Sequence, residues 1–254
     1  MSLRILFTAY VLRPLRALAL IALIVTGLII LATLFPLLPM RSREQVMQRW
    51  SQALLYIVGI RLRIVGDLPR SAALIVANHV SWADPFVLIA CSPVHFVAKA
   101  EIRSWPVFGW LAAQAGTIFI QRERARDVHK VTQSFTAALQ SGRSVGMFPE
   151  STTTNGKQLL PFKPPLFQVA LDANVACQPV ALRYEHDAVA WIDNMGFLSS
   201  IWRIMAVPQI PVVATYCAPV VPNSQMHRRD LAVASEAAIA SVLHQSAPPI
   251  PLEI

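Results

Sequence analysis

Charged residues are scarce in this chain. They make up 14% of its 254 residues, whereas hydrophobic residues make up 55%. A soluble globular domain carries roughly 25% charged residues, which is well above the share in this chain. A disordered chain contains far fewer hydrophobic residues than this one does, so disorder is excluded. The chain also has only nine glycines alongside nineteen prolines, which excludes a collagen or a long coiled coil. The length fits one good-sized core with an appendage.

Cysteine is almost absent too. Cys91, Cys177 and Cys217 stand far apart, with no Cys-x-x-Cys pair and no spacing typical of metal ligands. This excludes a disulfide framework and a zinc site, and it fits reduced, mostly buried thiols in a domain that faces the cytosol.

Acidic residues are nearly missing from residues 1–63, where eight arginines face Glu44 alone. This segment therefore carries +7 of the net charge of +8. A nucleic-acid-binding protein normally spreads its basic residues over the domain that docks the phosphates. Here they flank the most apolar stretch of the chain, which favours anionic membrane lipids as the partner and argues against nucleic acid.

The apolar stretch covers residues 17–40, which contain no charged residue across 24 positions. About 20 apolar residues of helix suffice to cross a bilayer. The stretch is longer than the core of a signal peptide, and no convincing cleavage site follows it. It is therefore expected to be a permanent membrane helix.

Two arrangements of this anchor remain open. Arginines on both sides give no orientation for a simple span. Pro36 and Pro39 break the helix near its end, and residues 42–58 then show the spacing of an amphipathic helix. This pattern favours a helical hairpin that dips into one leaflet over a span. We predict a membrane anchor over residues 1–60, a catalytic domain over 61–246 and a loose tail over 247–254.

From residue 61 onward, short Val- and Ile-rich runs alternate with helical stretches. The expected strands are 61–65, 73–77, 95–98, 117–120, 144–148, 179–183, 188–192 and 212–216. The expected helices are 85–91, 106–114, 126–141, 166–172 and 224–245. This alternation predicts an α/β fold with a mixed, largely parallel sheet flanked by helices. Active sites of such sheets lie beyond the carboxyl ends of the strands.

One such strand end carries His79 and Asp84, five residues apart. A turn between them would let the carboxylate meet the imidazole, fix its tautomer and support its protonated form. In the simpler alternative, Asp84 only caps the helix that starts at Pro85 and His79 is a loop residue.

The motif Asn78-His79-x4-Asp84 resembles the first signature block of the glycerolipid acyltransferases, and later blocks follow in order. These are Gly116 through Phe119 to Arg122, then Phe148-Pro149-Glu150-Ser151-Thr152, then Gln178-Pro179-Val180. Lys99-Ala100-Glu101 and Pro161-Phe162-Lys163 also resemble the bacterial 1-acyl-sn-glycerol-3-phosphate acyltransferases. The resemblance covers about residues 60–220.

The resemblance implies an enzyme that moves a fatty acyl group from a thioester to the sn-2 hydroxyl of 1-acyl-glycerol-3-phosphate, giving phosphatidic acid. It places this enzyme on the cytoplasmic face of a bacterial inner membrane. His79 would be the general base and Asp84 its orienting partner. No metal or organic cofactor is required, because acyl-coenzyme A or acyl carrier protein brings an activated thioester.

Five further residues are expected to bind substrate. The resemblance assigns Arg122 to the acceptor's phosphate, which a guanidinium fork matches, although a solvated surface arginine is the simpler alternative. Gly116 allows a tight turn before that strand. Glu150 would bond the acceptor, position Arg122 or merely tie down its own loop. Thr152 would add a hydroxyl, and Lys163 would meet phosphate or acyl carrier unless it is simply solvated.

The chain departs from the family pattern at two places. Ser151 stands where glycine is usual, and Pro164-Pro165 replace smaller residues. These departures leave open another acceptor, such as lyso-ornithine lipid. A non-catalytic membrane-binding protein is a further alternative, which the intact His79 and Asp84 oppose. A serine hydrolase is a third alternative. The chain has one Gly-x-Ser-x-Gly match, Gly142-Arg143-Ser144-Val145-Gly146, but its serine begins the expected strand 144–148, whereas the serine of a hydrolase elbow stands at a strand-to-helix turn.

Overall fold

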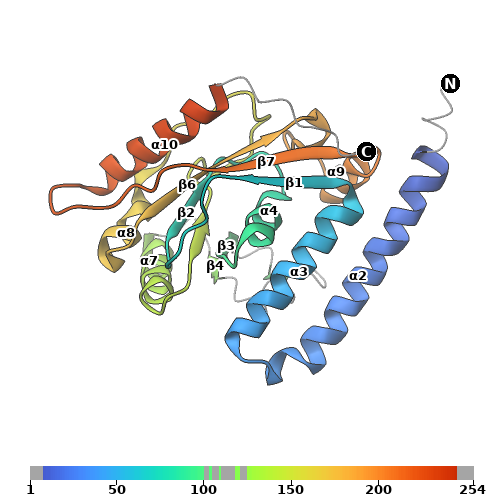
Figure 1. Ribbon diagram of the computed structural model, residues 1–254, viewed down its shortest axis with the longest axis horizontal. Helices are drawn as coiled ribbons and strands as arrows, with labels where there is room; N and C mark the ends of the chain where they lie inside the picture. The colour runs from blue at the N-terminus through green and yellow to red at the C-terminus, as the bar shows by residue number, and fades with distance from the viewer. Residues whose placement is uncertain (1–7, 100–102, 105–108, 110–117, 121–124, 245–254) are drawn as a thin grey trace.

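The computed structural model of the protein describes residues 8–99, 103–104, 109, 118–120 and 125–244 (Figure 1). The helices in these ranges are α2 (Arg13–Thr33), α3 (Met40–Val58), α4 (Asp84–Cys91), α7 (Ala125–Gln140), α8 (Gln168–Ala173), α9 (Phe197–Ile204) and α10 (Arg228–His244). The strands are β1 (Ile60–Val65), β2 (Leu74–Ala77), β3 (His95–Lys99), β4 (Ile118–Ile120), β5 (Val145–Met147), β6 (Cys177–Tyr184) and β7 (Ile210–Tyr216). A π-helical turn (Thr8–Leu12) precedes α2, and 3-10 turns cover Phe35–Leu37, Pro164–Phe167 and Asp187–Val189.

The described strands form one sheet in the order β1-β7-β6-β2-β5-β3-β4. Every neighbouring pair is parallel except β6 and β7, which are antiparallel. The predicted mixed, largely parallel sheet flanked by helices is therefore confirmed. Because β2, β3, β5 and β6 run in the same direction, their carboxyl ends meet at one edge of the sheet.

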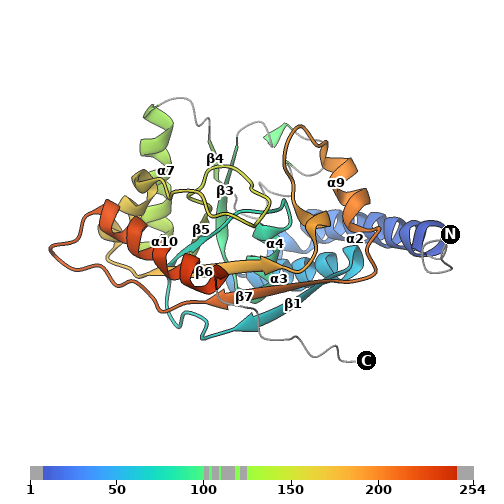
Figure 2. The ribbon, with the colours of Figure 1, turned by 90° about the horizontal axis from the view of Figure 1, so that it is seen from above.

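Alternate side chains of the central strand β2 point to opposite faces of the sheet, and the core therefore has two layers. Leu74 and Val76 pack with α7, α8 and α10, whereas Ile75 and Ala77 pack with α3 and α4 on the other face. All four side chains are buried, as expected for a strand covered on both faces. Figure 2 shows these two groups of helices on opposite sides of the sheet.

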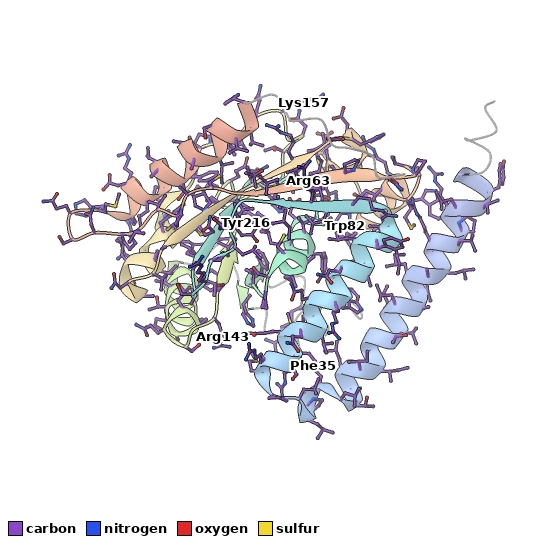
Figure 3. All side chains as sticks on the ribbon, viewed as in Figure 1. Phe35, Arg63, Trp82, Arg143, Lys157 and Tyr216 are labelled. Carbon is purple, nitrogen blue, oxygen red and sulfur yellow. The ribbon has the colours of Figure 1, made fainter. Side chains whose placement is uncertain are left out.

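The predicted N-terminal hairpin is present as α2 and α3. The stretch Tyr10–Thr33 is long and apolar enough to cross a membrane, judged by length and composition. At the tip of the hairpin Phe35 is buried beneath the guanidinium of Arg43, 5.3 Å from its ring (Figure 3). The second helix ends at Gly59, whose φ of +96° suits glycine.

Buried contacts attach this hairpin to the rest of the fold. From α2, the Arg16 guanidinium donates to the carbonyls of Met205 and Val207, just after α9. From α3, the amide of Gln48 donates to the Cys91 carbonyl at 3.0 Å. Leu54, Leu55 and Val58 of α3 also belong to the main core. The hairpin is thus packed onto the sheet domain rather than tethered to it.

The strand predicted at residues 188–192 is wrong. This segment is a 3-10 turn followed by a loop. Ala188, Val189 and Ala190 are buried, but the backbone N–H groups of residues 188–191 bond to turns and loops instead of a neighbouring strand. Ala188 N donates to His186 Nδ1 at the start of the turn, and Trp191 N donates to the Val80 carbonyl in another loop. No sheet position remains beside β6, because β2 and β7 occupy both its edges.

Two further differences concern helices. Helix α9, an eight-residue helix that follows Gly196, was not among the helices expected from the sequence. The helix predicted at residues 106–114 lies outside the described residues, apart from Gly109. The other predicted helices are present, with the stretch 166–172 divided between a 3-10 turn and α8.

Candidate active site

His79 is held at the carboxyl end of β2 by the residue before it. Asn78 is buried, and its side chain pairs with the backbone of Leu182 on β6, donating from Nδ2 at 2.9 Å and accepting at Oδ1 at 2.7 Å. These two bonds replace the ladder bonds that the strand would make one residue further. The backbone therefore leaves the sheet at His79 in a fixed direction.

Asp84 meets His79 as the sequence predicts. The Nδ1 atom of His79 lies 2.8 Å from Oδ2 of Asp84, a carboxylate with no exposed surface. The same oxygen accepts from the backbone N–H groups of Val80 and Ser81 at 2.7 and 2.8 Å. A carboxylate accepts only, so Nδ1 carries the proton and Nε2 is the nitrogen left to act as a base.

The simpler alternative, in which Asp84 only caps α4, is wrong. The helix begins at Asp84 itself, with Ala83 at the cap position and no side-chain cap bond. The carboxylate is turned back over residues 79–81, where its bonds to the loop replace a bond to the helix. The residue therefore serves the histidine and not the helix end.

Tyr184, at the end of β6, completes the site and was not among the residues expected there from the sequence. Its hydroxyl donates to Oδ1 of Asp84 at 2.6 Å. Burial, together with the charge of Asp84, raises the pKa of Tyr184 well above its usual range, so the hydroxyl keeps its proton. The sequence signal for Tyr184 is its polar hydroxyl at the end of an otherwise mostly apolar strand. Only the strand order shows that β6 lies beside β2, and so that this hydroxyl is near Asp84.

Aromatic stacking fixes the plane of the His79 ring. Phe148 stacks on it at 4.1 Å between centroids and 12° between planes, and Phe96 stacks on Phe148 in turn at 5.6 Å. The bond to Asp84 sets the tautomer and the stack sets the orientation. Together they hold the imidazole in one tautomer and one orientation at the edge of the sheet, as a general base requires.

Glu150 ties two loops together beside the histidine. It is buried, and its Oε1 accepts from the His79 N–H at 2.7 Å while Oε2 accepts from the Leu160 N–H at 3.0 Å. Desolvation raises the pKa of this carboxyl above its usual value, and these two backbone bonds offset part of the shift. Thr154 N adds a 2.8 Å bond to the His79 carbonyl from the same loop.

The remaining predicted substrate residues are not all brought together. Thr152 and Lys163 are exposed, and the Lys163 backbone bonds the Pro149 carbonyl. Gly116 and Arg122 lie outside the described residues, so their roles stay predictions. Within the described part of the chain, no group of three His, Cys, Asp or Glu side chains is placed to hold a metal ion.

Known proteins share this sequence pattern and fold. The profile of the Acyltransferase family matches residues 60–183. A lyso-ornithine lipid O-acyltransferase of Pseudomonas aeruginosa is 37% identical over 212 residues, covering 82% of this chain and 81% of that protein. A 1-acyl-sn-glycerol-3-phosphate acyltransferase of Neisseria meningitidis is 36% identical over 178 residues, covering 67% and 70%.

The chain belongs to the acyltransferase family.

The fold comparison agrees with that membership. The crystal structure of the 1-acyl-sn-glycerophosphate acyltransferase PlsC from Thermotoga maritima matches with a TM-score of 0.65. The match covers 92% of this chain and all of that one, at 16% identity. Similarity at this low identity establishes a shared architecture.

One departure of this acyltransferase from the family pattern has a visible backbone consequence. Ser151, at the position where glycine is usual, has a φ of +63°. A residue with a Cβ adopts this left-handed conformation at a cost that glycine does not bear. The loop that carries Glu150 thus keeps the conformation that glycine would favour, even with serine in place. Pro164 and Pro165 begin a 3-10 turn immediately after Lys163.

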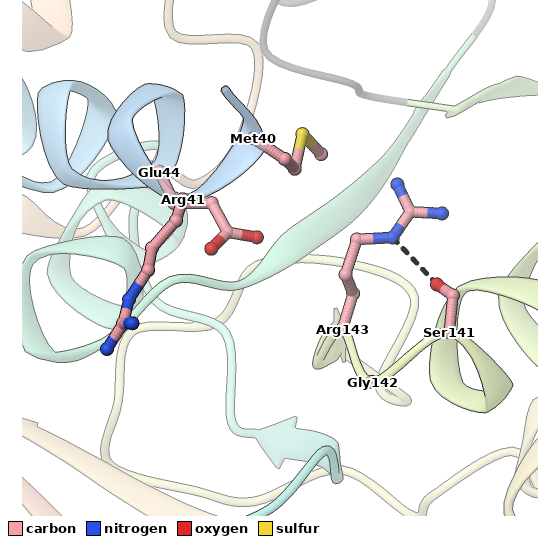
Figure 4. A pocket seen from close by; sticks show the side chains of 6 residues that line it. All are labelled: Met40, Arg41, Glu44, Ser141, Gly142 and Arg143. Carbon is pink, nitrogen blue, oxygen red and sulfur yellow. Dashed lines mark hydrogen bonds between the residues drawn. The ribbon is translucent and has the colours of Figure 1, made fainter. Parts of the chain in front are cut away.

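A hollow of about 530 Å³ lies away from this site. It is lined by Met40, Arg41, Glu44, Ser141, Gly142 and Arg143 (Figure 4). Arg143 donates to the Ser141 hydroxyl at 2.9 Å. This hollow adjoins the amino end of β5, whereas His79 follows the carboxyl end of the parallel strand β2. It is therefore separate from the edge of the sheet that carries His79 and Asp84.

Proposed function

We propose that this acyltransferase moves a fatty acyl group from an acyl thioester to the free hydroxyl of a lysolipid, at the cytoplasmic face of a bacterial inner membrane. The observation that carries the proposal is the 2.8 Å contact between His79 Nδ1 and a buried Asp84 carboxylate. This pair is a general base with a fixed tautomer and a neighbour that supports its charge.

The chemistry follows from the pair. Nε2 of His79 removes the proton of the lysolipid hydroxyl as the oxygen attacks the thioester carbonyl. The resulting imidazolium is supported by Asp84, and His79 then returns the proton to the leaving thiolate as the carbon–sulfur bond breaks. The products are an ester and a free thiol. This reaction needs no metal or organic cofactor, since coenzyme A or acyl carrier protein enters as a co-substrate.

The first candidate acceptor is 1-acyl-glycerol-3-phosphate, with phosphatidic acid as product. It is supported by the match to the Neisseria protein and by Arg122, whose guanidinium suits a phosphate. The second candidate is lyso-ornithine lipid, supported by the match to the Pseudomonas protein over most of both chains. Ser151 in the Glu150 loop distinguishes this chain from the glycine pattern and is compatible with either.

The reaction is tested with membranes that contain the full-length protein. Labelled acyl-coenzyme A and acyl carrier protein are each supplied with 1-acyl-glycerol-3-phosphate, lyso-ornithine lipid or lysophosphatidylcholine. We expect one acceptor to dominate and His79→Ala to abolish the transfer. If none of the three acceptors gave product, the acyl-transfer function would be overturned. A His79→Ala rate above about a tenth of the wild-type rate, which is only ~1.4 kcal/mol of barrier, would overturn the assignment of His79 as the base.

Arg122 distinguishes the two acceptors. If it binds phosphate, Arg122→Ala should raise the KM for 1-acyl-glycerol-3-phosphate about 10- to 150-fold, because a charged hydrogen bond contributes about 1.5–3 kcal/mol. The KM for the thioester should stay the same, and Arg122→Lys should recover only part of the loss. Equal losses on the phosphate and ornithine acceptors would contradict a phosphate-specific role.

A further inference from the structure

Helix α9 presents two large apolar side chains to solvent. Leu198 is 76% exposed and Trp202 is 48% exposed, whereas Ile201 and Ile204 on its other face are buried. Neither the proposed reaction nor the packing of the core uses the outer pair. Exposed apolar residues grouped on one face of a helix indicate an interaction surface.

The position of α9 beside α2 indicates what this surface meets. The Arg13 guanidinium of α2 lies over the Trp202 ring, 5.4 Å from its centroid. Arg16 bonds the backbone directly after α9, so the two helices are held together. Figures 1 and 2 both show α9 next to the amino-terminal part of α2.

The adjoining face of α2 is suited to lipid. Its exposed large residues are all apolar: Leu15, Leu18, Ile21, Val25 and Ile29. Tryptophan and arginine together are typical of the boundary between lipid and water, and Trp202 and Arg13 provide both where α9 meets α2. Two helices that contact each other at Arg13 and Trp202 thus both present apolar side chains to solvent.

The inner face of α9 contacts the loop between His79 and Asp84. Trp82 of this loop donates from its indole N–H to the Ser200 hydroxyl at 3.2 Å. Phe197 packs edge-on against Trp82, with 5.4 Å between centroids. The helix therefore joins the apolar outer surface to the catalytic loop.

We propose that the outer face of α9 inserts into the lipid surface beside α2 and forms the edge over which a membrane-embedded acceptor reaches His79. The occupant is the interfacial layer of an anionic bilayer. Leu198 and Trp202 contact acyl chains near the headgroups, and Arg13 contacts the headgroups themselves.

Insertion is tested directly with a fluorescent probe. An environment-sensitive dye is attached at Leu198→Cys in a Cys217→Ser background, which leaves Cys91 and Cys177 buried. With phosphatidylglycerol vesicles we expect a blue shift and quenching by lipids brominated near the headgroup. The matched control is Val233→Cys on α10, which is also an exposed apolar helix position, at 60%, and should give neither signal.

A kinetic experiment tests the path to the active site, and this experiment alone rests on the proposed function. Leu198→Glu with Trp202→Glu should lower kcat/KM at least 10-fold on a long-chain lysolipid in vesicles, yet less than 2-fold on a short-chain, monomeric one. Val233→Glu should change neither.

The outcomes separate the two proposals. A protein inactive with every acceptor would overturn the acyl-transfer function, while the probe would still report insertion. A Leu198 probe unaffected by vesicles, or a signal that depends on protein concentration without lipid, as in self-association, would overturn insertion. Equal losses on both acceptors would overturn the path to the active site.

Discussion

At the scale of single residues, the site depends on how one buried carboxylate is shared. Asp84 accepts from His79, Val80 and Ser81 at one oxygen and from Tyr184 at the other. A buried charge needs several donors of this kind to offset the loss of water. The Tyr184 hydroxyl, which donates to Oδ1, does not disturb the bonds at Oδ2, but it reduces the negative charge of the carboxylate that faces His79.

Replacing Tyr184 with phenylalanine should therefore alter the base without changing the fold. We expect kcat to fall about 10-fold, since a hydrogen bond to a charged group contributes about 1.5–3 kcal/mol. We also expect the acid limb of the pH–rate profile to move to higher pH, because Asp84 with one donor fewer holds the imidazolium more firmly. The profile of kcat against pH measures both effects.

Tyr216→Phe is the matched control for this change. Tyr216 is a buried tyrosine on β7 whose hydroxyl lies near Cys91 and Ser92 instead of the Asp84 carboxylate. Its variant should leave the profile in place. A Tyr184→Phe enzyme with an unshifted profile would show that Tyr184 is only a packing residue.

Glu150 should make stability depend on pH. Its pKa in the folded protein is raised above the value in the unfolded chain. Between these two values the folded state binds more protons, so the free energy of unfolding falls as pH rises through this window. The advantage of the wild type over Glu150→Gln should therefore be largest below pH about 4.5 and shrink above it.

Thermal unfolding of both proteins in detergent, over a series of pH values, measures this difference. The glutamine also loses one backbone bond, since it has a single acceptor oxygen, but that loss is the same at every pH. Curves of Tm against pH that run parallel for the two proteins would contradict the raised pKa of Glu150.

At the scale of elements, the charged side chain of Arg16, near the start of α2, attaches this helix to the sheet domain. Arg16 is a buried residue of an apolar helix, and its guanidinium donates to the carbonyls of Met205, Val207 and Pro208. These carbonyls follow α9 and have left the helix, so they need donors from outside it. The arginine thus sets where α2 meets the sheet domain.

Arg16→Met should loosen this attachment. The methionine keeps an apolar stem but leaves the three carbonyls without their donor, which costs about 2 kcal/mol. For a chain of this length that corresponds to a fall in Tm of roughly 4–8 °C, which differential scanning fluorimetry detects. Arg63→Met, at an exposed position on β1, is the control and should shift Tm by less than about 1 °C. Equal shifts in the two variants would refute the role of Arg16.

At the scale of the whole molecule, the N-terminal hairpin of α2 and α3 shares one core with the sheet domain. Leu54, Leu55 and Val58 of α3 pack with residues of the sheet, so a cut at residue 60 would remove part of that core. Half of the large apolar residues that are exposed in the described part of the chain, in contrast, lie before residue 40, on α2 and on the turns at its two ends.

Deleting residues 1–39 should therefore release a folded protein from membranes. The full-length chain should stay in the pellet after a sodium carbonate wash, and the deletion variant should move to the supernatant. Circular dichroism checks that the variant is folded. Flotation on a sucrose gradient distinguishes lipid-bound protein, which rises, from aggregates, which sink. A folded variant that still floats would show that α2 is not the main anchor.

The sequence alone determined the parts of this protein that local patterns encode. The uncharged run before Pro36, the alternating strands and the pair His79 and Asp84 at a strand end were each predicted and are present. Apolar periodicity and strand-end motifs depend on neighbours within a few residues, so they can be read along the chain.

The tertiary structure alone decided which distant residues meet. Tyr184 reaches Asp84 because β6 pairs with β2. Arg13 of α2 lies over Trp202 of α9. Arg16, one turn further along α2, bonds the carbonyl of Met205, which is 189 residues away in the sequence. The buried segment 188–192 resembles a strand in sequence, but both edges of β6 are already occupied. Strand order and long-range packing arise when the whole chain buries its apolar surface together, and no local pattern records that result.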